Sequence, residues 1–207
     1  MTAGMGDIKH GRKFDQVVEG AREIFLSAGF EGASVDDIAR AAQVSKATLY
    51  SYFPDKRRLF MEVAQRECQR QAEAAVARIQ MAGPACDVLF EAATEMTKFF
   101  LSDFGRQTFR IAVSEAERFP ELGREFYNSG PTRARGALVC YLKDRIEAGE
   151  LDIDDVGFAA EQFIELCKAG LHIEWVLGIR DGFTDAEVSR VIRGAVEMFL
   201  ARYGRKD

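Results

Sequence analysis

Hydrophobic residues recur every three or four positions along most of the chain, the spacing that places them on one face of an α-helix. The first such stripe is ended by Gly29 and consists of Phe14, Val17, Val18, Ala21, Ile24 and Phe25. The alternation of β-branched and polar residues that is typical of strands is absent. The pattern therefore predicts an all-α fold.

The same periodicity, read with the residues that start and end helices, predicts about nine of them. They occupy 12–29, 34–42, 46–53, 55–82, 86–101, 104–117, 120–148, 155–177 and 184–202. Gly130 and Pro131 are expected to interrupt the helix at 120–148. Thr184 and Glu187 form a capping box at the start of the last helix.

Two short helices joined by a tight turn lie between residues 34 and 53. Ser34 caps the first helix and Ser45 caps the second, because a serine hydroxyl accepts a hydrogen bond from a free backbone N–H at a helix start. The break between them covers only residues 43–45. This is the helix-turn-helix arrangement, whose second helix can enter the major groove of DNA.

Placing the residues of the second helix about 100° apart around its axis shows which of them share a face. Leu49 and Phe53 should face the core, and Ala47 and Ser51 lie on the opposite side. The two flanks are formed by Lys46 with Tyr50 and by Thr48 with Tyr52. Such a helix suits DNA, with flanks that grip phosphates and a centre that approaches base edges. The alternative is a solvated helix whose two tyrosines half-pack on neighbours.

The DNA contacts are expected from this motif and from the start of the next helix. Base contacts are predicted for Ala47, Thr48 and Ser51, and the cap residue Ser45 adjoins them. Phosphate contacts are predicted for Ser34, Lys46, Tyr50, Tyr52 and Lys56. Lys56 stands at the N-terminus of its helix, where backbone N–H groups favour an anion.

The same region resembles the DNA-binding domain of TetR/AcrR-family regulators. The matching residues are Ile24-Phe25-x-x-Ala28-Gly29-Phe30, Asp37-Ile38-Ala39-Arg40-Ala41-Ala42, Val44-Ser45, Thr48-Leu49-Tyr50-x-Tyr52-Phe53 and Lys56-x-x-Leu59-Phe60. The resemblance implies a three-helix helix-turn-helix domain at 12–58, after a Gly-rich tail at 1–11 that we expect to be flexible. It implies a larger helical effector-binding and dimerisation domain at 59–207, and a homodimer on double-stranded operator DNA.

The net charge of −5 is distributed unevenly. Residues 1–58 hold nine Lys and Arg against eight Asp and Glu, whereas the remainder holds nineteen against twenty-five. The acidity therefore belongs to the C-terminal part, and the charge argues for a localised contact with DNA rather than a diffuse one.

Composition also sets the expected compartment and excludes some chemistry. No apolar run approaches the roughly 18 residues of a membrane span, and the N-terminus lacks the apolar core of a signal peptide. The four cysteines are scattered without a Cys-x-x-Cys pair, which predicts a reducing cytoplasm, no metal and no cofactor. An enzyme is disfavoured, because His10 and His172 are the only histidines and no nucleophile–base spacing is visible.

The last two predicted helices carry more apolar surface than a monomer requires, and their small residues allow another helix to approach closely. Two such helices per chain could form a four-helix bundle across a two-fold axis. The predicted interface consists of Phe163, Gly170, Val188, Ile192, Ala195 and Phe199. The alternative is an internal core; the dimers of the family that the chain resembles favour the interface.

Aromatic residues concentrate in the middle of the predicted body, where they enclose an apolar cavity or simply form packed core. The resemblance implies a pocket for a small, mostly apolar effector, with an expected lining of Phe99, Phe104, Phe109, Phe126, Phe163, Cys167, Glu174 and Trp175. Glu174 falls on an apolar face, where an unpaired carboxylate is costly, so it orients a ligand, pairs across the dimer or sits at the solvated end of its helix. His172 is expected to be solvated.

The sequence as a whole predicts a cytoplasmic, dimeric transcriptional regulator. The favoured hypothesis is a repressor that a small effector releases from an inverted-repeat operator. The alternative is a ligand-independent architectural or nucleoid-associated protein that binds DNA with a filled body.

Overall fold

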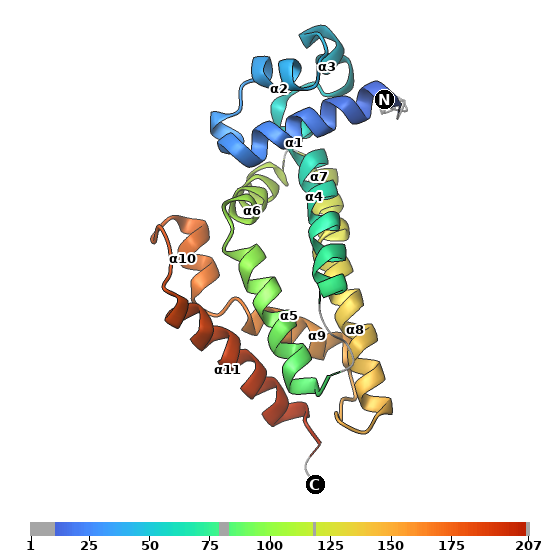
Figure 1. Cartoon of the computed structure of the whole chain (residues 1–207), viewed down its shortest axis with the longest axis vertical. Helices are drawn as coiled ribbons and strands as arrows, with labels where there is room; N and C mark the ends of the chain where they lie inside the picture. Colours follow the sequence, from blue (N-terminus) through green and yellow to red (C-terminus); the bar gives the residue numbers. More distant parts are fainter. Residues whose placement is uncertain (1–10, 79–82, 118, 206–207) are drawn as a thin grey trace. The chain divides into compact units, whose positions relative to one another are not determined.

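The computed structural model describes residues 11–78, 83–117 and 119–205, which form eleven α-helices and one isolated β-bridge between Leu151 and Gly204 (Figure 1). Their bounds are α1 Arg12–Gly32, α2 Val35–Ala41, α3 Lys46–Tyr52, α4 Lys56–Arg78, α5 Ala85–Phe100, α6 Asp103–Glu115, α7 Pro120–Ser129, α8 Pro131–Glu147, α9 Val156–Leu166, α10 Leu171–Leu177 and α11 Asp185–Tyr203. The all-α prediction is confirmed. None of the described helices is long and apolar enough to cross a membrane.

The chain divides into two compact units, Met1–Arg66 and Glu67–Asp207. The division falls later than the predicted boundary at residue 58, because the first turns of α4 pack inside the first unit. The Phe60 ring meets Phe25 edge-on with 5.0 Å between centroids. Arg66 pairs with Asp15 on α1 at 2.9 Å. The predicted tail lies outside the described residues except for Gly11, which precedes α1.

In the first unit, α2 and α3 lie on one side of α1 (Figure 1). The Phe14 ring of α1 stacks on Phe53, which follows α3, with 5.2 Å between centroids. Gly20 is needed for this packing, since a Cβ there would stand 2.5 Å from the backbone nitrogen of Ala42 at the end of α2. The helix-turn-helix motif is therefore held on α1 by direct backbone contact.

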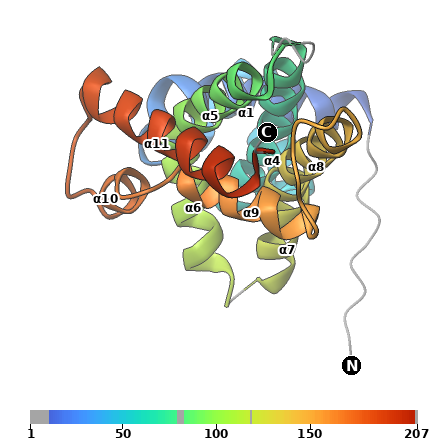
Figure 2. The same cartoon turned by 90° about the horizontal axis from the view of Figure 1, so that it is seen from below.

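The second unit has one hydrophobic core, formed mainly by α5, α8, α9 and α11. In the view of Figure 2, α11 lies beside α5 and α9. At its centre the rings of Phe163 and Phe199 meet edge-on, 5.1 Å apart, and Phe199 also contacts Tyr203 at 4.9 Å. Packing of this kind fixes the relative positions of α9 and α11.

The predicted helix boundaries are mostly confirmed, including the turn of α1 at Gly29 (φ 70°) and the break between α7 and α8 at Gly130. The predicted single helix at 155–177 is wrong. Gly170 adopts φ +78°, a conformation that L side chains rarely adopt, and it separates α9 from α10. This break and the one at Gly130 raise the number of helices from about nine to eleven. Residues 79–82 of the predicted long helix lie outside the described part.

Four of the six predicted dimer-interface residues are buried inside the single chain, and for them the internal-core alternative is correct. They are Phe163, Ile192, Ala195 and Phe199, none more than 4% exposed. Val188 is half-buried against the same core, and Gly170 is exposed. A side chain without exposed surface cannot form a contact between subunits unless the unit rearranges, so of the six predicted residues only Val188 and Gly170 have surface that a partner could reach.

We expect Phe199→Ala to lower the free energy of unfolding of the chain by about 3–5 kcal/mol, because it leaves a cavity at the centre of the core. The same substitution at Phe90, whose side chain is 43% exposed, should cost about 1 kcal/mol or less. Urea unfolding at one fixed protein concentration measures both values. Equal losses for the two variants would contradict the placement of Phe199.

Candidate nucleic-acid interface and effector region

The two helices of the helix-turn-helix motif are each capped by a serine. The hydroxyl of Ser34 accepts from the N–H of Asp37 at 3.0 Å, and that of Ser45 accepts from the N–H of Thr48 at 3.0 Å. In the turn between the helices, Gln43 adopts φ 53°. The caps matter because α2 and α3 have only seven residues each and are too short to be stable alone.

Helix α3 has the orientation that its sequence predicts. Leu49 is 1% exposed and Phe53 4%, so this side faces the core of the unit. The opposite side and one flank are exposed to solvent, and they carry Lys46, Ala47, Tyr50 and Ser51. The small side chains of Ala47 and Ser51 leave the middle of this surface low, with longer side chains beside it.

The other flank of α3, which carries Thr48 and Tyr52, is less exposed to solvent. Thr48 is half-buried, and its hydroxyl shares a 2.9 Å hydrogen bond with Ser45. Tyr52 is also half-buried and meets the Phe14 ring edge-on at 5.7 Å, so the half-packed alternative is correct for this tyrosine. Lys46 is exposed and pairs with Asp36 of α2, an exposed carboxylate.

Lys56 is not placed as the sequence predicts for a phosphate contact. Its ammonium donates hydrogen bonds to the carbonyl oxygens of Phe30 at 2.8 Å and Ala33 at 3.1 Å, and it lies 4.4 Å from the centroid of the Phe30 ring. The side chain points back to the end of α1. Two of the three N–H donors of this ammonium are thus already in use within the unit.

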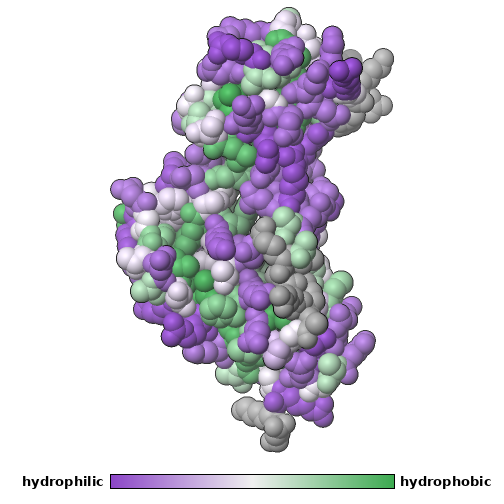
Figure 3. Space-filling view, viewed as in Figure 1, coloured by the Kyte–Doolittle hydropathy of each residue, from purple (hydrophilic) through white to green (hydrophobic). Residues whose placement is uncertain are grey.

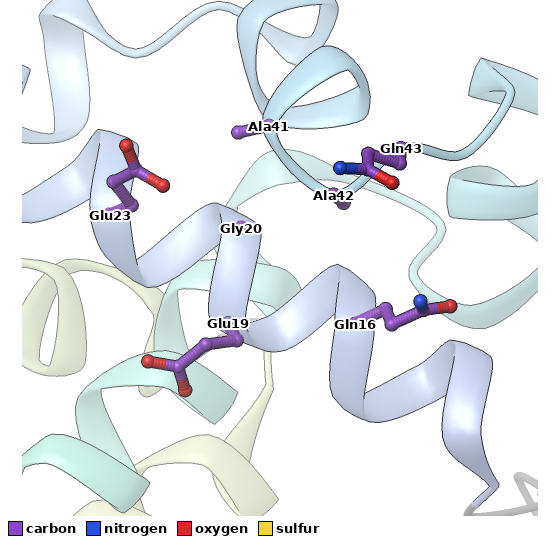
Figure 4. A pocket seen from close by; sticks show the side chains of 7 residues that line it. All are labelled: Gln16, Glu19, Gly20, Glu23, Ala41, Ala42 and Gln43. Atoms are coloured by element: carbon purple, nitrogen blue, oxygen red, sulfur yellow. The ribbon is translucent and has the colours of Figure 1, made fainter.

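A shallow depression lies between α1 and the end of α2 (Figure 4). Gln16, Glu19, Gly20 and Glu23 line it from α1, and Ala41, Ala42 and Gln43 line it from the other side. Gly20 lies at its base, where α1 and Ala42 are in close contact. Two carboxylates at its rim make it unsuitable for DNA phosphates.

Several aromatic residues of the second unit form a largely half-buried cluster where α6 contacts α5 and α10. The His172 ring of α10 lies between Phe100 of α5 and Phe109 of α6, at centroid distances of 5.7 and 5.2 Å. Phe99 contacts Phe100 at 6.1 Å, and Phe104 is half-buried on α6. Phe99 and Phe109 of the predicted lining are thus brought together with Phe100 and His172 at this place.

Trp175 and two cations complete this cluster. The indole Nε1 of Trp175 donates to the carbonyl oxygen of Ser102 at 3.3 Å, and the guanidinium of Arg106 lies 4.1 Å from the indole centroid. The ammonium of Lys168 lies 5.1 Å from the Phe100 centroid. The cluster therefore combines aromatic surface with positive charge, which attracts the electron-rich faces of the rings.

Several predicted effector contacts lie elsewhere. Phe163 and Cys167 belong to the core, and burial raises the pKa of the Cys167 thiol to about 12. Glu174 lies in the middle of α10, where its side chain is 41% exposed and pairs with Arg180 at 3.8 Å. Phe126 is half-buried on α7, and no ring contact between it and the cluster is observed among the described residues.

His172, Phe100, Arg106 and Lys168 belong to this cluster but are not among the predicted effector contacts. His172 was expected in solvent, yet it is half-buried between two rings, and burial lowers its pKa from 6.5. The prediction for His172 is wrong because it assumes one continuous helix at 155–177. The break at Gly170 turns α10 away from the direction that a continuous helix would have. The one sign of this break in the sequence is Gly170 itself, because glycine readily adopts a positive φ.

No group of three or more His, Cys, Asp or Glu side chains that could hold a metal ion occurs in the described parts of the chain. The four cysteines are free thiols, with Cys68 and Cys167 buried and Cys86 and Cys140 exposed.

A capped, outward-facing second helix in a helix-turn-helix motif, joined to a larger helical unit, defines a class of DNA-binding transcriptional regulators. Two family profiles agree with it. The profile of bacterial regulatory proteins of the tetR family matches residues 17–63, and that of the AefR-like transcriptional repressor C-terminal domain matches residues 87–205. The chain belongs to the TetR family of transcriptional regulators, whose members are not enzymes.

Individual relatives are consistent with this assignment. The structure of the flavonoid-responsive regulator FrrA is similar to the chain, with 34% identity, a TM-score of 0.71 and coverage of 95% of this chain and 100% of that one. A TetR family regulator from Pseudomonas syringae pv. tomato DC3000 is 26% identical, with a TM-score of 0.67 and coverage of 98% and 100%. The transcriptional repressor AcnR of Corynebacterium efficiens is 34% identical over 73 residues, which are 35% of this chain and 38% of AcnR. The chain thus spans well under half the length of that curated relative.

We expect His172→Gln to make the stability of the protein less dependent on pH. Because burial lowers the pKa of His172 below 6.5, the unfolded chain binds a proton more readily, and the wild type loses stability as the pH falls below that value. The variant should lose less between pH 7 and 5 in urea unfolding. His10→Gln is the matched control; an equal effect there, or an unchanged pH profile for His172→Gln, would contradict the burial of this ring.

Proposed function

We propose that the protein is a dimeric repressor that binds an inverted-repeat operator through α3 and is released from it by a small aromatic effector. The observation that carries the DNA part is the exposed surface of α3, where Lys46, Ala47, Tyr50 and Ser51 are all open to solvent. The family assignment and relatives named as repressors support the direction of regulation. Such a repressor works in the cytoplasm, where its operator is.

The exposed residues of α3 divide into two roles. Ala47 and Ser51 occupy the middle of the surface, where a methyl group suits a thymine methyl and a hydroxyl suits a base edge. Lys46 and Tyr50 on the flank suit phosphates, and Lys46 would exchange its partner Asp36 for DNA. Ser34 and Ser45 add exposed hydroxyls at two helix N-termini. Thr48 and Tyr52 contribute only if their present contacts with Ser45 and Phe14 loosen.

The effector class is inferred from FrrA, which is named as flavonoid-responsive. A flavonoid-like effector is a flat aromatic molecule with several hydroxyl groups. The aromatic cluster supports such a ligand, because the half-buried rings of Phe99, Phe104 and Phe109 and the buried ring of Trp175 provide flat apolar surface. The imidazole of His172 and the cations Arg106 and Lys168 supply polar partners for phenolic oxygens. This cluster replaces the predicted lining by Phe163 and Cys167.

If an effector releases the protein from its operator, binding of the effector must lower the affinity for DNA, and binding of DNA must lower the affinity for the effector. A flavone, flavanone or isoflavone that binds should weaken DNA binding by about 5- to 150-fold, and DNA should weaken its binding by the same factor. Titration of each compound with and without a duplex selected by the protein measures both factors. Compounds that bind equally well in both titrations, or a failure of all compounds to bind, would leave the architectural alternative in place.

We infer that the dimer interface uses exposed apolar residues of α9, α10, α11 and the segment after α10. Five large apolar side chains there are more than half exposed, namely Phe158, Ile173, Leu177, Ile179 and Met198. Hydrophobic residues reach the surface of the second unit among polar ones in Figure 3. Next to Met198, a shallow depression lined by Arg190, Arg193, Gly194 and Glu197 offers room for a partner helix. Large apolar groups on consecutive elements are costly in water and favour association.

On this proposal Met198→Glu should shift the protein from dimer to monomer at micromolar concentration, because it places a charge in an apolar contact. The chain should stay folded, since Met198 is 63% exposed in the single chain. Val113→Glu on α6, at a site 60% exposed, should leave the dimer intact. Light scattering with parallel melting curves tests this, and a Met198→Glu dimer of wild-type stability would move the interface elsewhere.

A further inference from the structure

The ammonium of Lys56 joins two parts of the first unit that are distant in sequence. Lys56 is the first residue of α4, and its two hydrogen bonds go to the carbonyl oxygens of Phe30 and Ala33. Ala33 is the last residue before Ser34, the cap of α2. A cation at this place also meets the negative end of α1, where carbonyl groups lack partners in the helix. The contact therefore ties the start of α4 to the connection between α1 and α2.

The aromatic rings around this lysine make the contact specific. Lys56 lies 4.4 Å from the Phe30 centroid, and Phe30 in turn meets Phe60 of α4 edge-on at 5.3 Å. Phe25 contacts both phenylalanines, at 6.1 and 5.0 Å. One ring from the end of α1 is thus held between a cation and a ring that both come from α4.

We propose that Lys56 is a positioning residue for DNA binding and not a phosphate ligand. By holding the α1–α2 connection on the first turn of α4, it fixes the helix-turn-helix motif relative to that helix. With both carbonyl bonds in place, the ammonium of Lys56 has a single N–H donor left, and its position over the Phe30 ring directs it into the unit. Helix α4 continues past Arg66 into the second unit, so this contact links the motif to the one helix that both units share.

The salt dependence of DNA binding separates positioning from phosphate contact. Each phosphate contact contributes about 0.9 to the slope of log K against log salt concentration. Lys56→Met should therefore weaken binding to a duplex selected from a random library by about tenfold or more and leave the slope unchanged. Lys46→Ala, at an exposed lysine of α3, should lower the slope by about 0.9. Binding is measured at a temperature where melting curves show every variant to be folded.

Phe30→Leu provides a test without any change of charge. It removes the ring beneath the ammonium and should weaken DNA binding in the same direction, with an unchanged slope. In a double-mutant cycle, the combined loss from Phe30→Leu and Lys56→Met should be smaller than the product of the two single losses. Lys56→Arg keeps a cation with several N–H donors and should recover most of the affinity. If Lys56→Met does not fold, Phe30→Leu and Lys56→Arg decide the question.

A slope reduced by about 0.9 in Lys56→Met, or unchanged affinity in Phe30→Leu, would overturn the positioning role. This inference rests on the proposed use of α3 for DNA binding, and the two can fail separately. An unchanged slope in Lys46→Ala would count against α3 as the contact helix, whereas the comparison of Lys56→Met with the wild type still decides how Lys56 acts.

Discussion

The close approach of α1 to the end of α2 is the constraint on which the DNA-binding unit depends. With a glycine at position 20, the backbone of α1 lies directly against Ala42, where any side chain would collide. This contact supports a motif made of two seven-residue helices, which have too few residues to be stable by themselves. Since the side of α3 that carries Leu49, continued by Phe53 after the helix, faces the core, the opposite side remains open to solvent.

Different kinds of side chain hold the helices together in the two units. In the first unit, phenylalanines from α1 and α4 and the two serine caps hold short helices in place. In the second, longer helices meet around Phe163 and Phe199, while exposed apolar residues such as Met198 remain on the outside. Helix α4 runs from the first unit into the second, and on the proposed function its movement is the covalent route from the effector to DNA binding.

Local patterns in the sequence were sufficient to predict the fold class, most helix boundaries and the orientation of α3. These features depend on neighbours three or four positions apart, such as Ser45 with Thr48 or Leu49 with Phe53. The errors concern contacts that are distant in sequence. Nothing near Lys56 shows that its ammonium reaches carbonyl groups 23 and 26 residues earlier, and helix periodicity cannot tell whether an apolar face meets its own chain or a second copy.

The break at Gly170 shows a further limit of periodicity. A helical pattern continues through residues 155–177, and only the backbone conformation at one glycine divides it. His172 consequently faces the rings of Phe100 and Phe109, and Trp175 contacts Ser102 and Arg106, instead of taking the positions that a continuous helix would give them. The positions of aromatic residues along the chain were sufficient to predict where the aromatic cluster lies. Which residues belong to it could be determined only from the tertiary structure.

The central claim is that α3, presented once by each of two subunits, recognises a symmetric DNA sequence. Selection of bound duplexes from a random library, followed by sequencing, tests it most directly. The account predicts enrichment of an inverted repeat whose half-site centres lie about one helical turn or more apart. Enrichment of sequences without two-fold symmetry, or no enrichment at all despite binding, would contradict it.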